Sequence, residues 1–228
     1  KREKNVTESL IKSENISGII SDNRFGVRDK NIPSAFITHQ LRVLSGSTTW
    51  LSSKLHQKII SKFDECWVPD HTGTKNLSGD LGHIEGFESS IKYLGPLSRF
   101  EKKDLQKKYD LLVVLSGPEP QRSFLEVKLL DGLQSYNGKI CFVKGLIENE
   151  QRKTQINHIT AYNFMTSQEL ETALNESKLV LSRSGYTSIM DYAKLEKKAF
   201  FIPTPGQFEQ EYLARKFKEE RVAPSCKQ

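Results

Sequence analysis

The chain alternates short apolar runs with longer amphipathic stretches, most clearly in its second half. There the apolar runs are nearly continuous, as in residues 110–116. Strands that are apolar on both sides are typical of a parallel sheet covered by helices on both faces. The pattern predicts strands at residues 110–116, 139–143, 156–164, 179–181 and 199–202. Helices are predicted at residues 120–132, from residue 166 with Glu169 in the first turn, at 188–195 and at 209–219.

The first half shows the same alternation. Strands are predicted at residues 16–21, 34–38, 65–68 and 91–94, and a helix at 51–60. The segment Gly95-Pro96-Leu97-Ser98-Arg99 has the composition of a linker. We therefore predict an α/β fold of two Rossmann-like parallel-sheet domains, residues 1–95 and 96–228. The first domain is expected to be incomplete, because the sequence opens within a predicted helix and no Gly-rich first strand-to-helix turn precedes residue 16.

Composition narrows the class of protein. The 228 residues are 36% hydrophobic and 27% charged, and no apolar run approaches the roughly 18 residues of a membrane span. No apolar signal region follows the N-terminus. The three cysteines, Cys66, Cys141 and Cys226, lack metal-ligand spacing, and their odd number suits a reducing compartment. We expect a cytoplasmic protein with no cofactor, no metal and no disulfide.

The net charge of +6 is the kind of excess that attracts nucleic acid or anionic lipid. Residues 99–108, however, mix both signs of charge, as solvated helical surfaces do. We therefore expect no nucleic acid partner. A peripheral contact of a basic face with the inner side of a membrane stays open.

The strongest chemical signal is the turn Ser182-Arg183-Ser184-Gly185-Tyr186-Thr187, between a predicted strand and a predicted helix. A Ser/Gly turn in this place exposes backbone N–H groups at the positive end of the helix, which suits a diphosphate. Plain helix capping has the same composition. Ligands of parallel sheets bind beyond the carboxyl ends of the strands, where Ser116, Gly117 and Asn163 also fall.

These residues carry a resemblance to a known family. Residues 182–193, 200–203 and 207–214 resemble the donor half of the B-fold sugar-nucleotide glycosyltransferases of family 28, which are related to the N-acetylglucosaminyltransferase that makes lipid II. Residues 32–40, 93–99 and 115–122 resemble further segments of that family in the same order. The resemblance extends from about residue 16 to about residue 216, and it implies a role in cell envelope biosynthesis.

The resemblance also implies roles for individual residues. Asp191 stands for the acidic residue that binds the ribose hydroxyls, and its carboxylate offers acceptors for both. Gln210 stands for a glutamine that contacts the sugar, but Glu211 replaces a second glutamine, which leaves the sugar open. The diphosphate is expected to contact Ser184, Gly185, Tyr186, Thr187 and Ser188. The remaining expected contacts are Asn163 beside the uracil, and Ser116, Gly117, Gln121 and Arg122 near the phosphates and the acceptor.

A glycosyltransferase of this fold inverts configuration by in-line attack of an acceptor hydroxyl. The reaction needs a base near the acceptor and electrostatic relief for the departing diphosphate, without a metal. His39, at a strand end, is the candidate base, although a lone histidine there also fits a structural role. The other histidines, His56, His71, His83 and His158, are interpreted as loop or surface residues.

The leading hypothesis is thus transfer of a hexose or N-acetylhexosamine from a UDP-sugar to a glycan or lipid acceptor. A UDP-sugar hydrolase or epimerase of the same fold, and a non-catalytic nucleotide-sugar-binding subunit, remain as alternatives. A dinucleotide oxidoreductase is disfavoured, because neither half carries Gly-x-Gly-x-x-Gly followed by an acidic residue.

Overall fold

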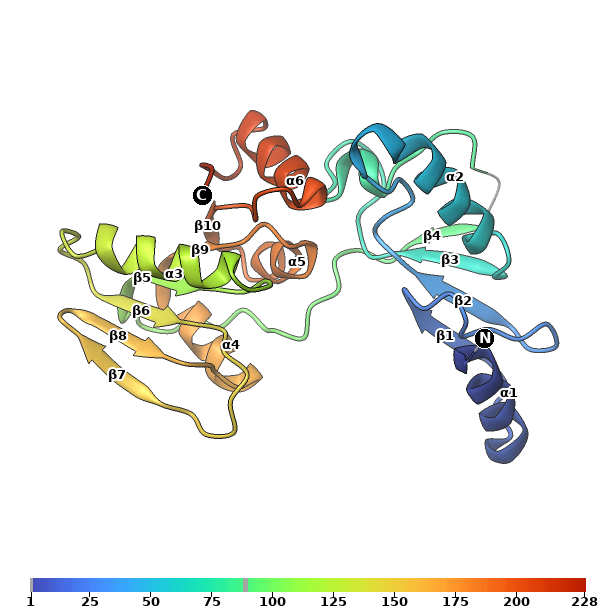
Figure 1. Cartoon of the computed structure of the whole chain (residues 1–228), viewed down its shortest axis with the longest axis horizontal. Helices are drawn as coiled ribbons and strands as arrows, with labels where there is room; N and C mark the ends of the chain where they lie inside the picture. The colour runs from blue at the N-terminus through green and yellow to red at the C-terminus, as the bar shows by residue number, and fades with distance from the viewer. Residues whose placement is uncertain (1, 88–89) are drawn as a thin grey trace. The chain divides into compact units, whose positions relative to one another are not determined.

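The computed structural model describes residues 2–87 and 90–228. It divides into two compact units, Lys1–Leu97 and Ser98–Gln228, which meet within the predicted linker segment. Each unit is an α/β structure built on its own sheet (Figure 1). In the described residues, no helix combines the length and the apolar character that crossing a membrane requires.

The first unit is built on a four-stranded parallel sheet of order β1-β2-β3-β4. Its core is formed by Phe36, Leu41, Ile60, Cys66 and Val68, all fully buried. The elements in chain order are α1 (Arg2–Glu14), β1 (Ile19–Asp22), β2 (Ser34–Ile37), η1 (Gly46–Thr48), α2 (Thr49–Ile60), β3 (Glu65–Val68), η2 (Gly79–Leu81) and β4 (Ile91–Tyr93), where η marks a 3-10 helix.

The second unit is built on a six-stranded sheet of order β10-β9-β5-β6-β8-β7. Strand β6 is buried along its whole length and β5 over Leu111, Leu112 and Val113, as the continuous apolar runs predicted. The elements are β5 (Tyr109–Val114), α3 (Gln121–Gly132), β6 (Ile140–Val143), β7 (Lys153–Ile156), β8 (Ile159–Tyr162), α4 (Ser167–Asn175), β9 (Ser177–Ser182), α5 (Tyr186–Lys194), β10 (Lys198–Phe201) and α6 (Phe208–Glu219).

Strand β7 departs from the sequence-based expectation. Residues 156–164 were expected to form one strand, but the structure has an antiparallel hairpin of β7 and β8 with Ile156 paired to Ile159. Asn157 occupies the turn with a positive φ of 53°, a conformation that asparagine tolerates better than most residues. The sheet is therefore parallel except at this edge.

The order of strands in the second sheet reverses between β5 and β9. The chain runs outward from β5 to β6 and β8, and then returns to place β9 and β10 on the other side of β5. Figure 1 shows α3 and α4 on opposite faces of this sheet, as right-handed crossovers in opposite directions require. Such a reversal is where open α/β sheets bind ligands, at the carboxyl ends of the two central strands.

Candidate functional site

The segment that follows β9 lies at the point of reversal and leads directly into α5. Gly185 is the N-cap residue of α5, and no side chain caps this helix. Helix α4, in contrast, is closed by a capping box between Thr166 and Glu169. Helices α3 and α6 also begin without a side-chain cap, but α5 directly follows β9 at the point of reversal, so its first backbone amides are placed to receive a ligand there.

The glycines at this edge serve different purposes. Gly117 has a φ of 104°, and at Gly145 an added Cβ would lie 2.2 Å from the carbonyl oxygen of Leu115. Both positions therefore require glycine for the backbone itself. Gly185 has a φ of −70° and a ψ of 140°, which any residue adopts, and a Cβ there would meet nothing within 4 Å. Glycine at 185 instead leaves room in front of the turn.

The turn is tied to the segment after β10. The Ser184 hydroxyl donates to the carbonyl oxygen of Gln210 at 2.8 Å, and the Gln210 side-chain oxygen accepts from the amide of Thr204 at 2.9 Å. Gly185 and Gln210, which are expected to share one site, are therefore neighbours. The Ser184 hydroxyl and the Gln210 side-chain oxygen are nevertheless buried and used inside the protein.

Arg183 is buried beneath the same turn, with a relative exposure of 1%. Its guanidinium donates to the carbonyl oxygens of Ile202 at 3.0 Å, Pro203 at 3.1 Å and Gln121 at 3.0 Å. The Nε atom has no partner among the described residues. Burial lowers the pKa of this guanidinium from its usual value.

Asp191 lies one turn further along α5. Its Oδ1 accepts a hydrogen bond from the Ser98 hydroxyl at 2.6 Å. Burial raises the pKa of Asp191, while the Ser98 hydrogen bond and the charge of Arg99 act in the opposite direction. The carboxylate is therefore half-buried and oriented, as a group that selects a pair of hydroxyls needs to be.

Two other expected contacts, Arg122 and Asn163, are buried and occupied by the protein, whereas Glu211 is exposed and accepts one internal hydrogen bond. Arg122 is buried and donates to Glu119, Glu126 and the Lys144 carbonyl oxygen. Its charge is thus compensated, and we leave it out of the site.

Asn163 is buried as well. Its side-chain oxygen accepts from the backbone amides of Arg152 and Phe164, and its side-chain nitrogen donates to the Glu148 carboxylate and the Glu150 carbonyl oxygen. The Glu211 carboxylate accepts from the Gly206 amide at 2.9 Å.

The expected contacts that remain exposed or half-exposed follow β5, β9 and β10. Tyr186, in contrast, is buried, with a relative exposure of 3%. The accessible or half-accessible residues are Ser116, Gly117, Gln121, Gly185, Thr187, Ser188, Asp191 and Glu211.

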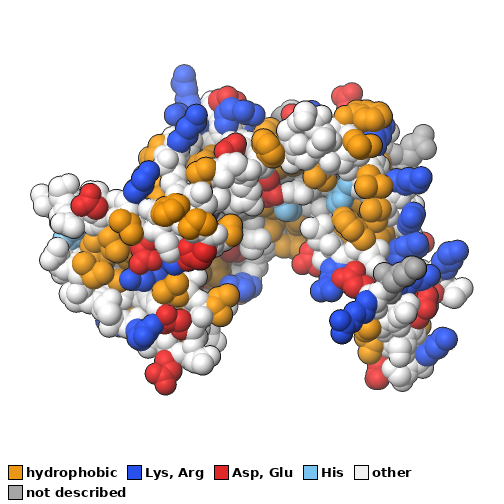
Figure 2. All heavy atoms as spheres, in the orientation of Figure 1, with side chains coloured by type: hydrophobic (Ala, Val, Ile, Leu, Met, Phe, Trp, Pro, Cys, Tyr) orange, Lys and Arg blue, Asp and Glu red, His pale blue; other side chains and the backbone are white. Residues whose placement is uncertain are grey.

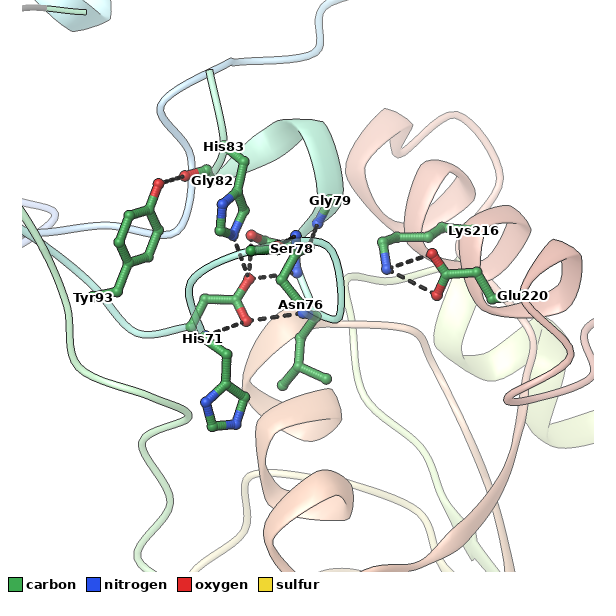
Figure 3. Close-up of polar contacts among 12 residues, drawn as sticks. His71, Asn76, Ser78, Gly79, Gly82, His83, Tyr93, Lys216 and Glu220 are labelled. Carbon is green, nitrogen blue, oxygen red and sulfur yellow. Dashed lines mark hydrogen bonds and ion pairs between the residues drawn. The ribbon is translucent and has the colours of Figure 1, made fainter. Parts of the chain in front are cut away.

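In the first unit, the sequence pattern missed a polar cluster centred on Asp70, just after β3 (Figure 3). Asp70 is fully buried, and its carboxylate accepts from the amides of His71, Leu77 and Ser78, each at 2.8 Å, and from the Ser78 hydroxyl. The His83 Nε2 atom lies 3.3 Å from Asp70 Oδ2. The imidazole of His83 also stacks on Tyr93, with ring centroids 4.7 Å apart.

Burial by itself would raise the pKa of Asp70, but the hydrogen bonds from Leu77, Ser78 and His71 outweigh it. The pKa is therefore lowered from its ordinary value of 3.8. The ionised carboxylate staples residues 70–83 and orients His83. His39, the candidate base, is half-buried just after β2.

The interpretation of His56 as a loop or surface residue is wrong. His56 is buried in α2 and packs edge-on against Phe25 and Phe36. Burial lowers its pKa from 6.5, although a hydrogen bond to the Gln40 backbone acts in the opposite direction. The thiols of Cys66 and Cys141 are buried too, and burial raises the pKa of each to about 12, so both are unreactive. Among the described residues, no three or more His, Cys, Asp or Glu side chains are grouped to hold a metal ion.

The chain has two α/β units, each built on a largely parallel sheet, and the strand order of the second sheet reverses in front of α5. This is the fold of the B-type glycosyltransferases. Solved structures of that class match over nearly the whole chain. Acinetobacter baumannii MurG aligns with a TM-score of 0.56 and 13% identity, over 98% of this chain and 63% of that one. CalG4, the calicheamicin glycosyltransferase, aligns with a TM-score of 0.62 and 9% identity, over 98% and 64%. Arabidopsis thaliana UGT89C1 aligns with a TM-score of 0.63 and 10% identity, over 99% and 61%.

The glycosyltransferase family 28 C-terminal domain matches residues 112–227, just over half of the chain. The chain belongs to this family. A search of curated protein sequences gave no significant match. The chain spans less than two thirds of the length of each of the three solved structures above.

Proposed function

We propose that this chain serves a glycosyltransferase that moves a hexose or N-acetylhexosamine from a UDP-sugar to a glycan or lipid acceptor, with inversion and without a metal. The observation that carries the proposal is Gly185. Neither backbone conformation nor packing requires glycine there, and the residue stands at the uncapped end of α5 with open space before it. A diphosphate that approaches the helix amides closely accounts for all three facts.

Two similar structures support a nucleotide diphosphate in this role. UGT89C1 was solved in complex with UDP-L-rhamnose, and the spinosyn rhamnosyltransferase SpnG in complex with thymidine diphosphate. In the proposed site the backbone at Gly185, the hydroxyls of Thr187 and Ser188, and the turn of Ser116 and Gly117 receive the diphosphate. Asp191 receives the ribose, and Gln210 and Glu211 lie on the sugar side.

The proposed reaction is a single displacement. The acceptor hydroxyl attacks the anomeric carbon, the bond from that carbon to the diphosphate oxygen breaks, and the hydroxyl proton passes to a base. His39 is the proposed base, because it follows β2 at the carboxyl edge of the first sheet. The departing UDP carries the bonding electron pair, and the positive end of α5 stabilises the charge that develops.

Calorimetric titration with UDP tests the donor site. Asp191→Ala is expected to weaken binding by about 1 to 3 kcal/mol, because ribose hydroxyls would lose a charged acceptor. Asp191→Glu keeps the carboxylate and is expected to retain most of the affinity. A wild-type chain that binds no UDP would refute the proposed donor, and equal affinity in wild type and Asp191→Ala would refute the placement of the ribose.

We also propose that the enzyme contacts a membrane peripherally through α2. Trp50, Leu51 and Leu55 are 72%, 62% and 60% exposed, and lie on one side of the helix together with the exposed Lys54 and Lys58. The opposite side of α2 carries the buried residues Ser53, His56 and Ile60. Figure 2 shows hydrophobic and basic side chains together over this helix. An exposed tryptophan beside leucines and lysines suits the headgroup region of an anionic bilayer.

Co-sedimentation with vesicles tests this contact. The wild-type chain is expected to sediment with vesicles of phosphatidylcholine and phosphatidylglycerol, and less with phosphatidylcholine alone. The double substitution Trp50→Ser, Leu55→Ser should weaken partitioning by about tenfold or more, because two large apolar side chains no longer leave water. Val127→Ser, at a 69% exposed position in the second unit, is the matched control and should leave binding unchanged. Undiminished sedimentation of the double variant would contradict the assignment to α2.

A further inference from the structure

Arg183 is a buried cation that has no counterion among the residues that the structure describes. Arg122 and Arg183 are both buried in the second unit, but Arg122 is neutralised by Glu119 and Glu126. The partners of Arg183 in the described part of the chain are three carbonyl oxygens, with no carboxylate among them. Carbonyl dipoles satisfy hydrogen bonds but carry no negative charge, so the positive charge is left uncompensated.

An isolated buried charge is costly unless something offsets it. Moving a charged side chain out of water carries a penalty that uncharged hydrogen-bond partners repay only in part. The lowered pKa of the Arg183 guanidinium has the same origin, since burial disfavours its charged form. A protein that keeps such a group at the carboxyl edge of its sheet gains from it when an anion is present.

A second unsatisfied group lies at the same edge. The hydroxyl of Thr204 is buried and has no partner among the described residues. It lies 3.6 Å from the position of a Cβ on Gly117, in the turn after β5. The Arg183 Nε atom and the Thr204 hydroxyl are thus both left unsatisfied, one beside each turn that flanks the strand reversal.

We propose that Arg183 is an electrostatic positioning residue for a diphosphate. Its guanidinium is too buried to contact the ligand directly. Its charge instead acts through the weakly screening interior on the anion in front of Gly185, and adds to the positive end of α5. Its three carbonyl contacts hold the turn after β9, the segment after β10 and the start of α3 in one arrangement. This inference rests on the proposed function.

In this role, Arg183 makes the site selective for ligands that carry more negative charge. If Arg183 only held the surrounding segments in place, its loss would change the affinities for a nucleoside and for its diphosphate equally. An uncompensated cation favours the ligand with phosphates, and favours it more as the number of negative charges rises. The quantity that separates the two roles is therefore the ratio of UDP affinity to uridine affinity, with UMP between them.

Calorimetry with UDP, UMP and uridine on the full chain measures this ratio. Arg183→Met is expected to lower the UDP-to-uridine affinity ratio by about tenfold or more, whereas Arg183→Lys, which keeps the charge, should hold it within about threefold. Lys194→Met removes the same charge from an exposed position in the last turn of α5 and is the matched control. Its ratio should equal that of the wild type.

Each result decides between the two roles. An equal loss of UDP and uridine affinity in Arg183→Met would overturn the proposal and leave Arg183 as a staple. Absence of UDP binding in the wild type would refute the proposed function itself, before any variant is compared. If Arg183→Met does not fold, Arg183→Gln takes its place, because glutamine donates hydrogen bonds without a charge.

The wild type provides a further measurement that needs no substitution. Its Tm is expected to rise in inorganic pyrophosphate relative to chloride of equal ionic strength, because an anion that binds only the folded state stabilises it. An unchanged Tm would count against the proposal.

Discussion

Asp70→Ala is expected to destabilise the first unit by about 3 to 5 kcal/mol, the loss typical of breaking a buried, hydrogen-bonded charged network. The substitution removes the acceptor of three backbone amides and one hydroxyl, of which the amide and hydroxyl of Ser78 are fully buried. It also frees His83 from its carboxylate. Residues 70–83 then lose the group that holds them against β3.

Urea denaturation followed by tryptophan fluorescence measures this loss in the right part of the chain. Both tryptophans, Trp50 and Trp67, belong to the first unit, so their emission reports its unfolding. Asp22→Ala, at an exposed aspartate of the same unit, is the control and is expected to change stability by less than about 0.5 kcal/mol. A midpoint for Asp70→Ala equal to that of the control would show that the cluster contributes little.

The pH dependence of the same transition gives an independent check. The pKa of Asp70 is lower in the folded chain than in the unfolded one, so the unfolded state takes up the proton first as the pH falls. The contribution of the ionised Asp70 to folding stability is present above about pH 4 and is lost as the pH drops through the pKa of Asp70 in the folded chain. Stability of the wild type should therefore fall more steeply below pH 4 than that of Asp70→Ala, and parallel curves would contradict the assignment.

Gly185→Val is expected to weaken UDP binding by about 100-fold while leaving the fold intact. Valine adopts the backbone conformation of Gly185 without strain, and apart from its two neighbours in the chain its Cβ meets no atom of the described residues within 4 Å. The side chain therefore enters the space that the diphosphate is proposed to occupy, and it keeps the phosphates away from the amides of α5. Calorimetry with UDP and thermal unfolding together separate the two effects, with stability expected to change by no more than about 1 kcal/mol.

Gly132 provides the matched control for this substitution. It closes α3, lies in open space and has no positive φ, so Gly132→Ala should leave UDP affinity unchanged and raise stability slightly. Gly185→Ala should fall between the wild type and Gly185→Val in affinity. Full UDP affinity in Gly185→Val would remove the observation on which the proposed function depends.

The fold of the second unit was largely predictable because its central strands are mostly buried. Continuous apolar runs identified β5, β6 and β9, and the first-turn Glu169 identified the start of α4. Strand β7 was missed because Lys153-Thr-Gln-Ile156 is an exposed edge strand with no apolar periodicity. The signal that would have found it is Asn157-His158 between two isoleucines, a two-residue turn that favours asparagine.

The site was predictable only in outline. Chain order and the parallel sheet place Gly117, Gly185 and Asp191 at one edge, since these positions follow from topology. Topology does not reveal which side chains form hydrogen bonds within the protein. Arg122 and Asn163 are held by residues several positions away, and Asp70 gathers donors from a loop whose conformation the sequence does not reveal.

The polar hairpin edge formed by β7 has a consequence for the behaviour of the protein in concentrated solution. A bare edge of a sheet recruits strands from other molecules, which leads to aggregation. Here the outermost strand is only four residues long, exposed along most of its length, and begins with Lys153. A strand from another molecule that paired with β7 would have to cover the charge of Lys153 and polar side chains while burying little apolar surface. Intermolecular pairing at this edge of the sheet is therefore disfavoured.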